Sequence, residues 1–446
     1  MTGAPPSSDE DGRARNGRGN GVNVSRRVLH ALTTGAVRAL GRVRGWLPEW
    51  ANRGLDWVRW RIPQSWIRAL TGGTPVSVDD WEYPGVHDRP AIPATTRRLF
   101  IGPANFAGQG YAWARTAERA VPDLGAICFA LQIEGGFSFP DDFSASPLVY
   151  RKNRRWQQEQ LDYVSGFTHV IIEAGRPLFA DLLRLDPFRE ARRLAEGGIR
   201  VAMLSHGSDS RDPARHAARY EWSPYRDRDW VEVPRLRRQA RRFARRLREW
   251  EGVVFVSTPD LLDDLPFATW CPVVVDPDLW RSAVPVLERE RPVVVHAPSN
   301  SRVKGSDLVD AALAPLHDAG VVEYRRIGRV PAEAMPGVYR DADVVLDQFR
   351  LGSYGVAACE AMAAGRVVVG NVAEPVRSRV REATGLELPI VQAEPDAIAD
   401  VVLRLLEERD RGREAAAAGE AFVEHVHSGP FAGEALRTFL EGGTDG

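Results

Sequence analysis

Two series of short β-rich runs alternate with helix-length stretches along most of this chain. The first series begins near residue 97 and contains RRLFIG, GAICFAL, THVIIE, IRVAML and GVVFVS. After a stretch rich in proline and aspartate around 272–285, the second contains RPVVVHA, VEYRRI, ADVVLD, RVVVG and LPIV. Strands that alternate with helices form parallel sheets, because each parallel connection needs a crossover. The sequence therefore predicts an α/β fold with two Rossmann-like domains that face a central cleft.

The same alternation predicts the domain boundaries. We expect a first Rossmann-like domain over 91–285 and a second over 286–425. A last helical segment, 426–446, is expected to return toward the first domain. Residues 1–25 are Gly, Ser, Asp, Arg and Asn with almost no apolar content, which predicts a disordered tail. Residues 26–90 lie between this tail and the first domain.

Residues 26–90 are expected to form a basic helical arm in which arginines alternate with tryptophans. The longest uncharged run, 28–37, is too short and too polar to span a bilayer, and no signal cleavage site follows it. Tryptophan and arginine together are typical of helices that bind an anionic membrane surface, so residues 26–72 are one candidate for such binding. Packing of the arm on the first domain is the other interpretation. The second basic segment, 234–250, is interpreted as a solvated helix.

The overall charge and the cysteines narrow the class of protein. A net charge of −1 gives no reason to expect a polyanion, and we recognise no nucleic-acid-binding motif. Cys128, Cys271 and Cys359 lie far apart and form no CxxC motif or Cys/His cluster, so neither a zinc site nor a disulfide framework is expected. We expect a cytoplasmic protein that can associate peripherally with the inner face of the cell membrane.

The loop after RPVVVHA combines two cations with the start of a helix. Arg302, Lys304 and Gly305 are expected in this loop. Ser306 or Asp307 can cap the helix that follows. Fixed positive charge, the helix dipole and free backbone N–H groups suit a pyrophosphate. For this segment alone, a surface loop with ordinary charges is the alternative.

A second segment points to the same ligand. The strand ADVVLD ends at Asp347, and Gly352 and Gly355 then flank Ser353 and Tyr354 at an expected helix start. Glycines there allow the backbone to approach a ligand closely, and the helix start offers further N–H groups to its phosphates. These residues are therefore predicted to bind the same phosphate ligand.

The helix after Gly355 contains mostly small residues and a single carboxylate, Glu360. A charge on a close-packed helix is costly unless it is hydrogen-bonded, and two neighbouring ribose hydroxyls would satisfy it. A salt bridge to an arginine is the alternative, since the chain is rich in arginine.

The first domain supplies two strand-end loops of its own. RRLFIG runs into a glycine-bearing turn that opens a helix near residue 110, and IRVAML leads into SHGSDSR. Glycine-rich turns are common after a first strand, and a lone histidine is often structural. The acceptor-side candidates are Asn105, Gly108, Gln109, Gly110, Ser208 and Asp209, and the catalytic candidate is His206.

The two segments of the second domain resemble the donor-binding half of GT-B glycosyltransferases, in particular the large retaining family four (group 1). The resemblance is strong over 291–372 and weaker upstream, where HGSD resembles the family's active-site loop. It implies that Arg302 and Lys304 contact the donor diphosphate and that Glu360 holds the ribose. Many members carry a glutamate eight positions before the ribose-binding glutamate, where it contacts the donor sugar. This chain has Gly352 there.

The resemblance implies a hexosyltransferase that uses a UDP- or GDP-linked sugar and no metal or other cofactor. Its acceptor would be a glycan, a lipid-linked precursor of a cell-envelope glycan or a small molecule. In retaining members the acceptor bond forms on the same face of the sugar from which the phosphate leaves. Catalysis then consists mostly of positioning the substrates and stabilising the charge on the leaving group, which the resemblance assigns here to Arg302 and Lys304. Two alternatives remain. One is a sugar-nucleotide epimerase of the same fold, and the other is a non-catalytic scaffold that docks through its basic arm, which Gly352 favours.

Overall fold

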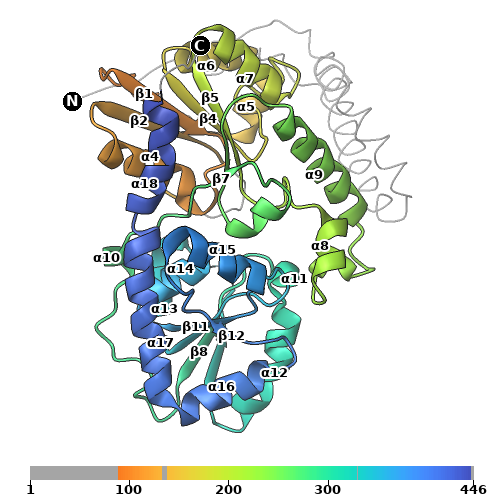
Figure 1. The fold of residues 1–446 in the computed structure, drawn as a ribbon, viewed down its shortest axis with the longest axis vertical. Coiled ribbons are helices and arrows are strands. Elements are labelled where there is room, and N and C mark those ends of the chain that lie inside the picture. The colour runs from red at the N-terminus through yellow and green to blue at the C-terminus, as the bar shows by residue number, and fades with distance from the viewer. Residues whose placement is uncertain (1–88, 133–137, 329, 443–446) are drawn as a thin grey trace, which may run out of the picture. The chain divides into compact units, whose positions relative to one another are not determined.

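The structure is a computed structural model that describes residues 89–132, 138–328 and 330–442 (Figure 1). The expected tail, 1–25, and all but the last two residues of the expected arm, 26–90, lie outside the described residues. None of the helices that the structure describes has the length and apolar character needed to cross a bilayer.

The first domain is built on a parallel sheet. Five strands lie where the first series of β-rich runs predicts them, namely β1 (Arg97–Gly102), β2 (Leu124–Leu131), β4 (His169–Glu173), β5 (Arg200–Ser205) and β6 (Val254–Val256). Two short edge strands, β3 (Phe143–Ala145) and β7 (Thr269–Trp270), complete the order β3-β2-β1-β4-β5-β6-β7. The helices are α4 (Gln109–Ala120), α5 (Pro147–Lys152), α6 (Arg154–Val164), α7 (Pro187–Glu196), α8 (Pro213–Arg219) and α9 (Val233–Arg248).

The second domain is built on a smaller parallel sheet. Its five strands are β8 (Val293–His296), β9 (Glu323–Arg326), β10 (Val344–Leu346), β11 (Val367–Gly370) and β12 (Val391–Gln392), in the order β12-β11-β10-β8-β9. The first four match the second series of β-rich runs, and β12 shares only Val391 with the run LPIV. Its helices are α11 (Ser301–Lys304), α12 (Ser306–Asp318), α13 (Met335–Arg340), α14 (Val356–Ala363), α15 (Glu374–Thr384), α16 (Ile398–Glu407) and α17 (Arg409–Phe422). The linker contains α10 (Pro277–Trp280), which packs on α13 and α14. The prediction of two parallel α/β units is confirmed.

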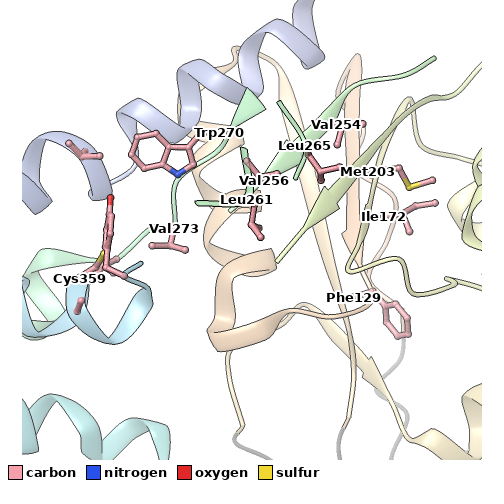
Figure 2. Packing of buried hydrophobic residues seen from close by; sticks show 14 of the residues in the cluster. Phe129, Ile172, Met203, Val254, Val256, Leu261, Leu265, Trp270, Val273 and Cys359 are labelled. Carbon is pink, nitrogen blue, oxygen red and sulfur yellow. The ribbon is translucent and has the colours of Figure 1, made fainter. Parts of the chain in front are cut away.

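Both sheets have fully buried central strands, as parallel sheets covered by helices require. The side chains of β4 and β8 are buried along their whole length. A single hydrophobic cluster runs from Phe129 and Met203 of the first sheet, through Val273 in the linker, to Cys359 in α14 (Figure 2). Apolar packing therefore continues from one domain into the other.

The chain returns to the first domain at its carboxyl end. After α17, a π-helical turn (Val423–His427) leads into α18 (Pro430–Glu441), which packs against α4 (Figure 1). His427 is buried in that turn, and burial lowers its pKa to about 4. Its neutral ring bonds the Val273 carbonyl oxygen through Nδ1 at 2.8 Å and lies 3.3 Å from the Tyr354 hydroxyl through Nε2. This histidine joins the linker, the return segment and the second domain.

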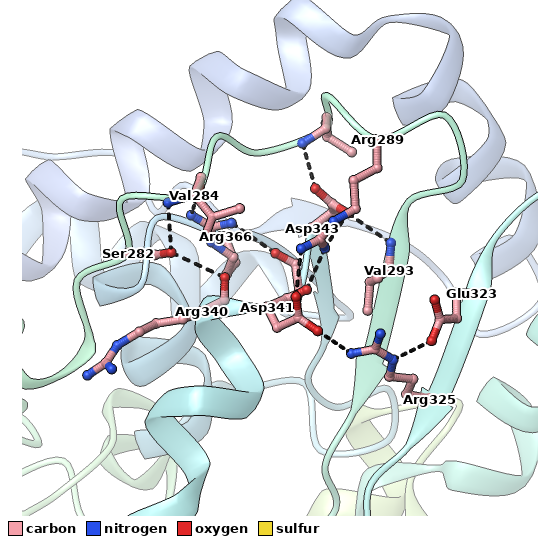
Figure 3. Close-up of polar contacts among 12 residues, drawn as sticks. Ser282, Val284, Arg289, Val293, Glu323, Arg325, Arg340, Asp341, Asp343 and Arg366 are labelled. Atoms are coloured by element: carbon pink, nitrogen blue, oxygen red, sulfur yellow. Dashed lines mark hydrogen bonds and ion pairs between the residues drawn. The ribbon is translucent and has the colours of Figure 1, made fainter.

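A polar network holds the linker against the amino ends of β8 and β10 (Figure 3). At its centre, the fully buried Asp343 carboxylate accepts hydrogen bonds from the backbone N–H groups of Leu287 and Val293, each at 2.8 Å. Arg289 pairs with the same carboxylate at 3.2 Å. Because this edge is opposite to the carboxyl ends of the strands, the network serves stability, away from the expected ligand site.

Candidate functional site

Arg302 and Lys304, which were expected in a loop, lie on a short helix. Arg302 and Lys304 belong to α11, which Asn300 caps by accepting a hydrogen bond from the Val303 N–H at 3.2 Å. Gly305, in the left-handed conformation with φ of 76°, separates α11 from α12. A glycine suits this junction because other residues are strained there.

The expectation that Ser306 or Asp307 caps α12 is wrong. The Ser306 hydroxyl is buried and bonds the His296 Nε2 at 2.8 Å. Asp307 pairs with Arg350 at 2.7 Å. The N-cap of α12 is Gly305, which has no side chain to accept the bond. Without a capping side chain, the first N–H groups of α12 are left without an intrahelical partner.

Lys304 and Arg302 have different partners. The Lys304 ammonium lies 2.6 Å from the Asp347 carboxylate at the end of β10, and both side chains are largely buried. Arg302 instead pairs with Asp227 of the first domain, and its guanidinium lies 5.7 Å from the centre of the Trp230 ring. The structure therefore brings Lys304 together with Asp347, and it joins Arg302 to the first domain.

The side chains between Gly352 and Gly355 are used in packing between the domains. Ser353 is buried and donates a hydrogen bond to Asp260 of the first domain at 2.7 Å. Tyr354 is buried against His427. Their side chains hold the domains together, so only the backbone of this segment can contribute to a donor site. Gly355 begins α14 without a side-chain cap, which leaves the first N–H groups of that helix available.

Gly352 has a φ of +65°, and a side chain there would meet the first domain. A Cβ at this position would lie 3.0 Å from the Tyr220 ring. The preceding carbonyl oxygen, of Leu351, is 3.1 Å from the Nε2 of His216 in α8. Since burial lowers the pKa of His216 to about 4, the neutral ring donates this bond. The first domain thus covers the position at which the family that the sequence resembles carries a sugar-contacting glutamate.

The side-chain carboxyl group of Glu360, on α14, has no ion pair or hydrogen bond with any described residue. The expected alternative, a salt bridge to an arginine, is therefore wrong for the part of the chain that the structure describes. Burial raises the pKa of Glu360 to about 8, while Lys304 lowers it and Asp347 raises it. A partly buried carboxyl group without a protein partner, close to Lys304 and Asp347, is what a site for two ribose hydroxyls requires.

Replacing Glu360 with glutamine is expected to change how stability depends on pH. The raised pKa means that the folded protein holds a proton that the unfolded chain releases above about pH 4.5, so this group's contribution to stability falls as pH rises toward 8. Glutamine does not titrate. In urea unfolding, the stability of Glu360→Gln relative to the native chain should rise with pH across this window. The exposed Glu382→Gln on α15 is the control, and equal pH profiles for both variants would contradict the expectation.

In the first domain, a buried glutamate connects the loops after three strands. Glu173, at the end of β4, is fully buried, and its Oε2 accepts hydrogen bonds from the backbone N–H groups of Ala104 and Asn105, each at 3.0 Å. Its Oε1 lies 3.0 Å from the Nε2 of His206, which follows β5. The Phe106 and Trp113 rings flank the histidine at 5.1 and 5.5 Å. Glu173 was not among the predicted residues, although an acid at the end of THVIIE was a signal for it.

The other acceptor-side candidates mainly shape these loops. The Asp209 carboxylate accepts hydrogen bonds from the N–H groups of His206 and Gly207, at 3.2 and 2.7 Å, while Ser208 is exposed. The amide of Gln109 is buried and forms two hydrogen bonds with the backbone of Val274 in the linker, at 2.7 and 3.0 Å. The side chain of Gln109 is thus used in holding the linker.

The first-strand turn is equally constrained. Asn105 donates to the Pro140 carbonyl at 2.8 Å and accepts from the Tyr111 N–H at 3.1 Å. Gly108 has a φ of +72°, and a Cβ on Gly110 would lie 3.2 Å from the Glu173 carboxylate. These residues therefore place the start of α4 close to Glu173 and His206. Among the described residues, no group of three or more His, Cys, Asp or Glu side chains is arranged to hold a metal ion.

Of three comparisons with known proteins, only the search of solved structures found proteins similar to this chain. No family model and no curated protein matches the chain. Sucrose-phosphate synthase from Thermosynechococcus elongatus matches with 14% identity and a TM-score of 0.49, covering 77% of this chain and 97% of that one. HepE from Anabaena in complex with UDP-glucose matches with 12% identity and a TM-score of 0.48, covering 77% and 98%. WaaG, a glycosyltransferase involved in lipopolysaccharide biosynthesis, matches with 12% identity and a TM-score of 0.48, covering 78% and 100%.

The two sheets and the last helix define the architecture of the chain. It has a seven-stranded and a five-stranded parallel sheet, and a last helix, α18, that packs on α4 of the first domain. This arrangement is the GT-B fold.

Proposed function

We propose that this protein is a glycosyltransferase that transfers a hexose from a UDP- or GDP-linked donor to a glycan, lipid-linked or small-molecule acceptor. The observation that carries the proposal is the unpartnered Glu360 beside Lys304 and the uncapped start of α14. The ammonium and the helix N–H groups suit a diphosphate, and the carboxyl group suits the ribose. A site with these three parts recognises a nucleoside diphosphate.

The proposed reaction proceeds with retention and needs no metal. The acceptor oxygen forms the new bond to the anomeric carbon, the bond from that carbon to the diphosphate oxygen breaks, and the leaving phosphate takes the acceptor proton. Lys304 and the helix N–H groups stabilise the charge on the leaving group. His206, held by Glu173, is positioned to contact the acceptor. Arg302 contributes on the donor side once its pairing with Asp227 is exchanged for the diphosphate.

A donor panel tests this proposal. UDP-, GDP- and dTDP-sugars are compared by thermal shift, because a selective ligand stabilises the folded state by mass action. The sugar that binds is then supplied in labelled form with total lipid and glycan extracts. Transfer of label onto an acceptor is the expected result. Absence of a thermal shift with every nucleotide sugar would overturn the proposal.

Two alternative functions, a non-catalytic scaffold and a sugar-nucleotide epimerase, predict other results in the same donor panel. Gly352, covered by Tyr220, favours a non-catalytic scaffold, which would give no transfer and no selective shift. A sugar-nucleotide epimerase of the same fold would convert the donor sugar without consuming any acceptor. Analysis of the recovered donor by chromatography separates these two results from transfer.

An anionic membrane surface is a further proposed partner, through residues 26–72. It is supported by the alternation of arginine and tryptophan in that segment. Flotation with anionic liposomes is expected to recover the full chain and to lose a chain that lacks residues 1–72. Equal flotation of both chains would remove the arm from this role and would favour its packing on the first domain.

A further inference from the structure

Arg176 lies at the strand-end edge of the first sheet, next to the Glu173 and His206 loops. After β4 the chain turns through Ala174 and Gly175, which have φ angles of 53° and 58°, and the Arg176 N–H donates to the Glu173 carbonyl oxygen at 3.0 Å. A Cβ on Gly175 would lie 2.6 Å from the Phe243 ring of α9, so this turn is tightly packed. The turn fixes where the arginine side chain starts.

The guanidinium of Arg176 has no hydrogen-bond or ion-pair partner among the described residues. Its Cζ lies 4.8 Å from the centre of the Phe106 ring, and that ring in turn contacts the His206 ring edge-on. The side chain is partly buried. Burial lowers the pKa of Arg176, although Tyr150, Glu173 and Asp209 oppose that effect. A partly buried cation with five N–H donors and no acceptor is costly for the ligand-free protein.

The side-chain oxygen atoms of the acids and the tyrosine around Arg176 already form hydrogen bonds with other groups. Both carboxylate oxygens of Glu173 are bonded, one to two backbone N–H groups and the other to His206. The Asp209 carboxylate accepts from the backbone of its own loop. The Tyr150 hydroxyl donates to the Pro177 carbonyl at 2.5 Å. None of these groups forms an ion pair with Arg176, so its donors are left for an acceptor from outside the described chain.

A second cation lies in the same area. Arg151, at the end of α5, acts on Arg176 as a like charge and lowers its pKa. A phosphoryl group carries up to two negative charges and three acceptor oxygens, so it can satisfy several of the Arg176 donors. Arginine also binds phosphate oxygens in a bidentate manner.

We propose that Arg176 binds a phosphoryl group carried by the acceptor and thereby places the acceptor beside His206. This inference rests on the proposed function, because it identifies the chemical class of the acceptor as phosphate-bearing. The phosphate belongs either to a soluble phosphorylated molecule or to a lipid headgroup. Arg176 acts in binding the acceptor, while the donor diphosphate is held by the second domain.

The test measures phosphate binding with the donor site already filled. Inorganic phosphate is titrated by ³¹P NMR into the full chain saturated with UDP or GDP, whichever the donor panel selects, and the affinity for that nucleotide is measured separately. We expect Arg176→Gln to raise the Kd for phosphate by about tenfold or more while leaving the Kd for the nucleotide unchanged. Arg176→Lys keeps the charge but loses the bidentate geometry and should be intermediate. Arg193→Gln, at an exposed position of α7, is the matched control and should behave as the native chain.

Vesicles distinguish the two sources of the phosphate. Binding to phosphatidic acid vesicles, but not to pure phosphatidylcholine vesicles, that is lost in Arg176→Gln would place the phosphate on a lipid. Soluble phosphate binding without this vesicle dependence would place it on a soluble acceptor. Phosphate binding that is absent from the nucleotide-saturated chain, or unchanged in Arg176→Gln, would overturn the inference. Failure of both UDP and GDP to bind would instead count against the proposed function.

Discussion

Replacing Lys304 with alanine should reduce turnover by about 10²- to 10³-fold, the loss typical when one stabilising contact to a developing charge is removed. The Lys304 ammonium lies at the end of α11, 2.6 Å from Asp347 and next to the uncapped start of α12. It is therefore placed to neutralise a diphosphate as it leaves. Turnover is measured with the donor identified by the nucleotide-sugar panel.

The same change also affects stability, and a second variant separates the two effects. Asp347 is buried, and removal of its partner leaves an uncompensated charge, which costs about 3–5 kcal/mol in buried pairs. The double variant Lys304→Met with Asp347→Asn removes both charges together. We expect it to recover most of the lost stability but not the turnover. Near-normal turnover in either variant, measured on folded protein, would contradict the role given to Lys304.

Glu173→Ala should lower both stability and turnover. The change leaves two buried backbone N–H groups and the Nε2 of His206 without their shared acceptor. Unsatisfied buried donors cost about 1–3 kcal/mol each, so a loss of about 3 kcal/mol in the free energy of unfolding is expected from urea titration. The first-strand loop and His206 would then lose their common anchor, and turnover on folded protein should fall about tenfold or more.

Asp343→Ala is the matched control for Glu173→Ala. Asp343 is also fully buried and also accepts two backbone N–H bonds, but it lies at the opposite edge of the second sheet (Figure 3). It should lose comparable stability while keeping its turnover per folded molecule. Glu173→Gln, which retains one carbonyl acceptor, should recover part of the stability. If Glu173→Ala and Asp343→Ala lose turnover equally, Glu173 has a structural role only.

The elements that the sequence predicts well are those with strong local patterns. All ten β-rich runs overlap a strand. The buried strands among them, such as β2 and β10, are continuous apolar segments, whereas β9 has the sequence EYRR and is only partly buried. The edge strands β3 and β7 contain three and two residues and have no pattern long enough to indicate a strand. Lys304 and Glu360 could be selected because their neighbours in sequence are glycines and small residues, which constrain the local backbone.

The features that the sequence does not predict are contacts between distant segments. The Ser353 hydroxyl bonds Asp260, and Tyr354 packs on His427, so side chains that resemble donor contacts hold the domains together. Arg302 likewise pairs with Asp227 of the first domain, so it also contributes to the contact between the domains. Glu173 gains its importance because three strand ends meet at one edge of the sheet. Such partners are set by the packing of the domains, and local spacing carries no information about them.

Binding of a nucleoside diphosphate by the second domain, with Glu360 on the ribose, can be measured directly. Isothermal titration compares UDP with 2′-deoxy-UDP, and GDP with 2′-deoxy-GDP, on the native chain and on Glu360→Ala. We expect one nucleotide to bind at a single site, and its 2′-deoxy form to bind about tenfold more weakly. Glu360→Ala should remove most of that difference, because the ribose hydroxyl has then lost its partner. Failure of both nucleotides to bind, or an equal preference for the ribose hydroxyl in the two proteins, would contradict the claim.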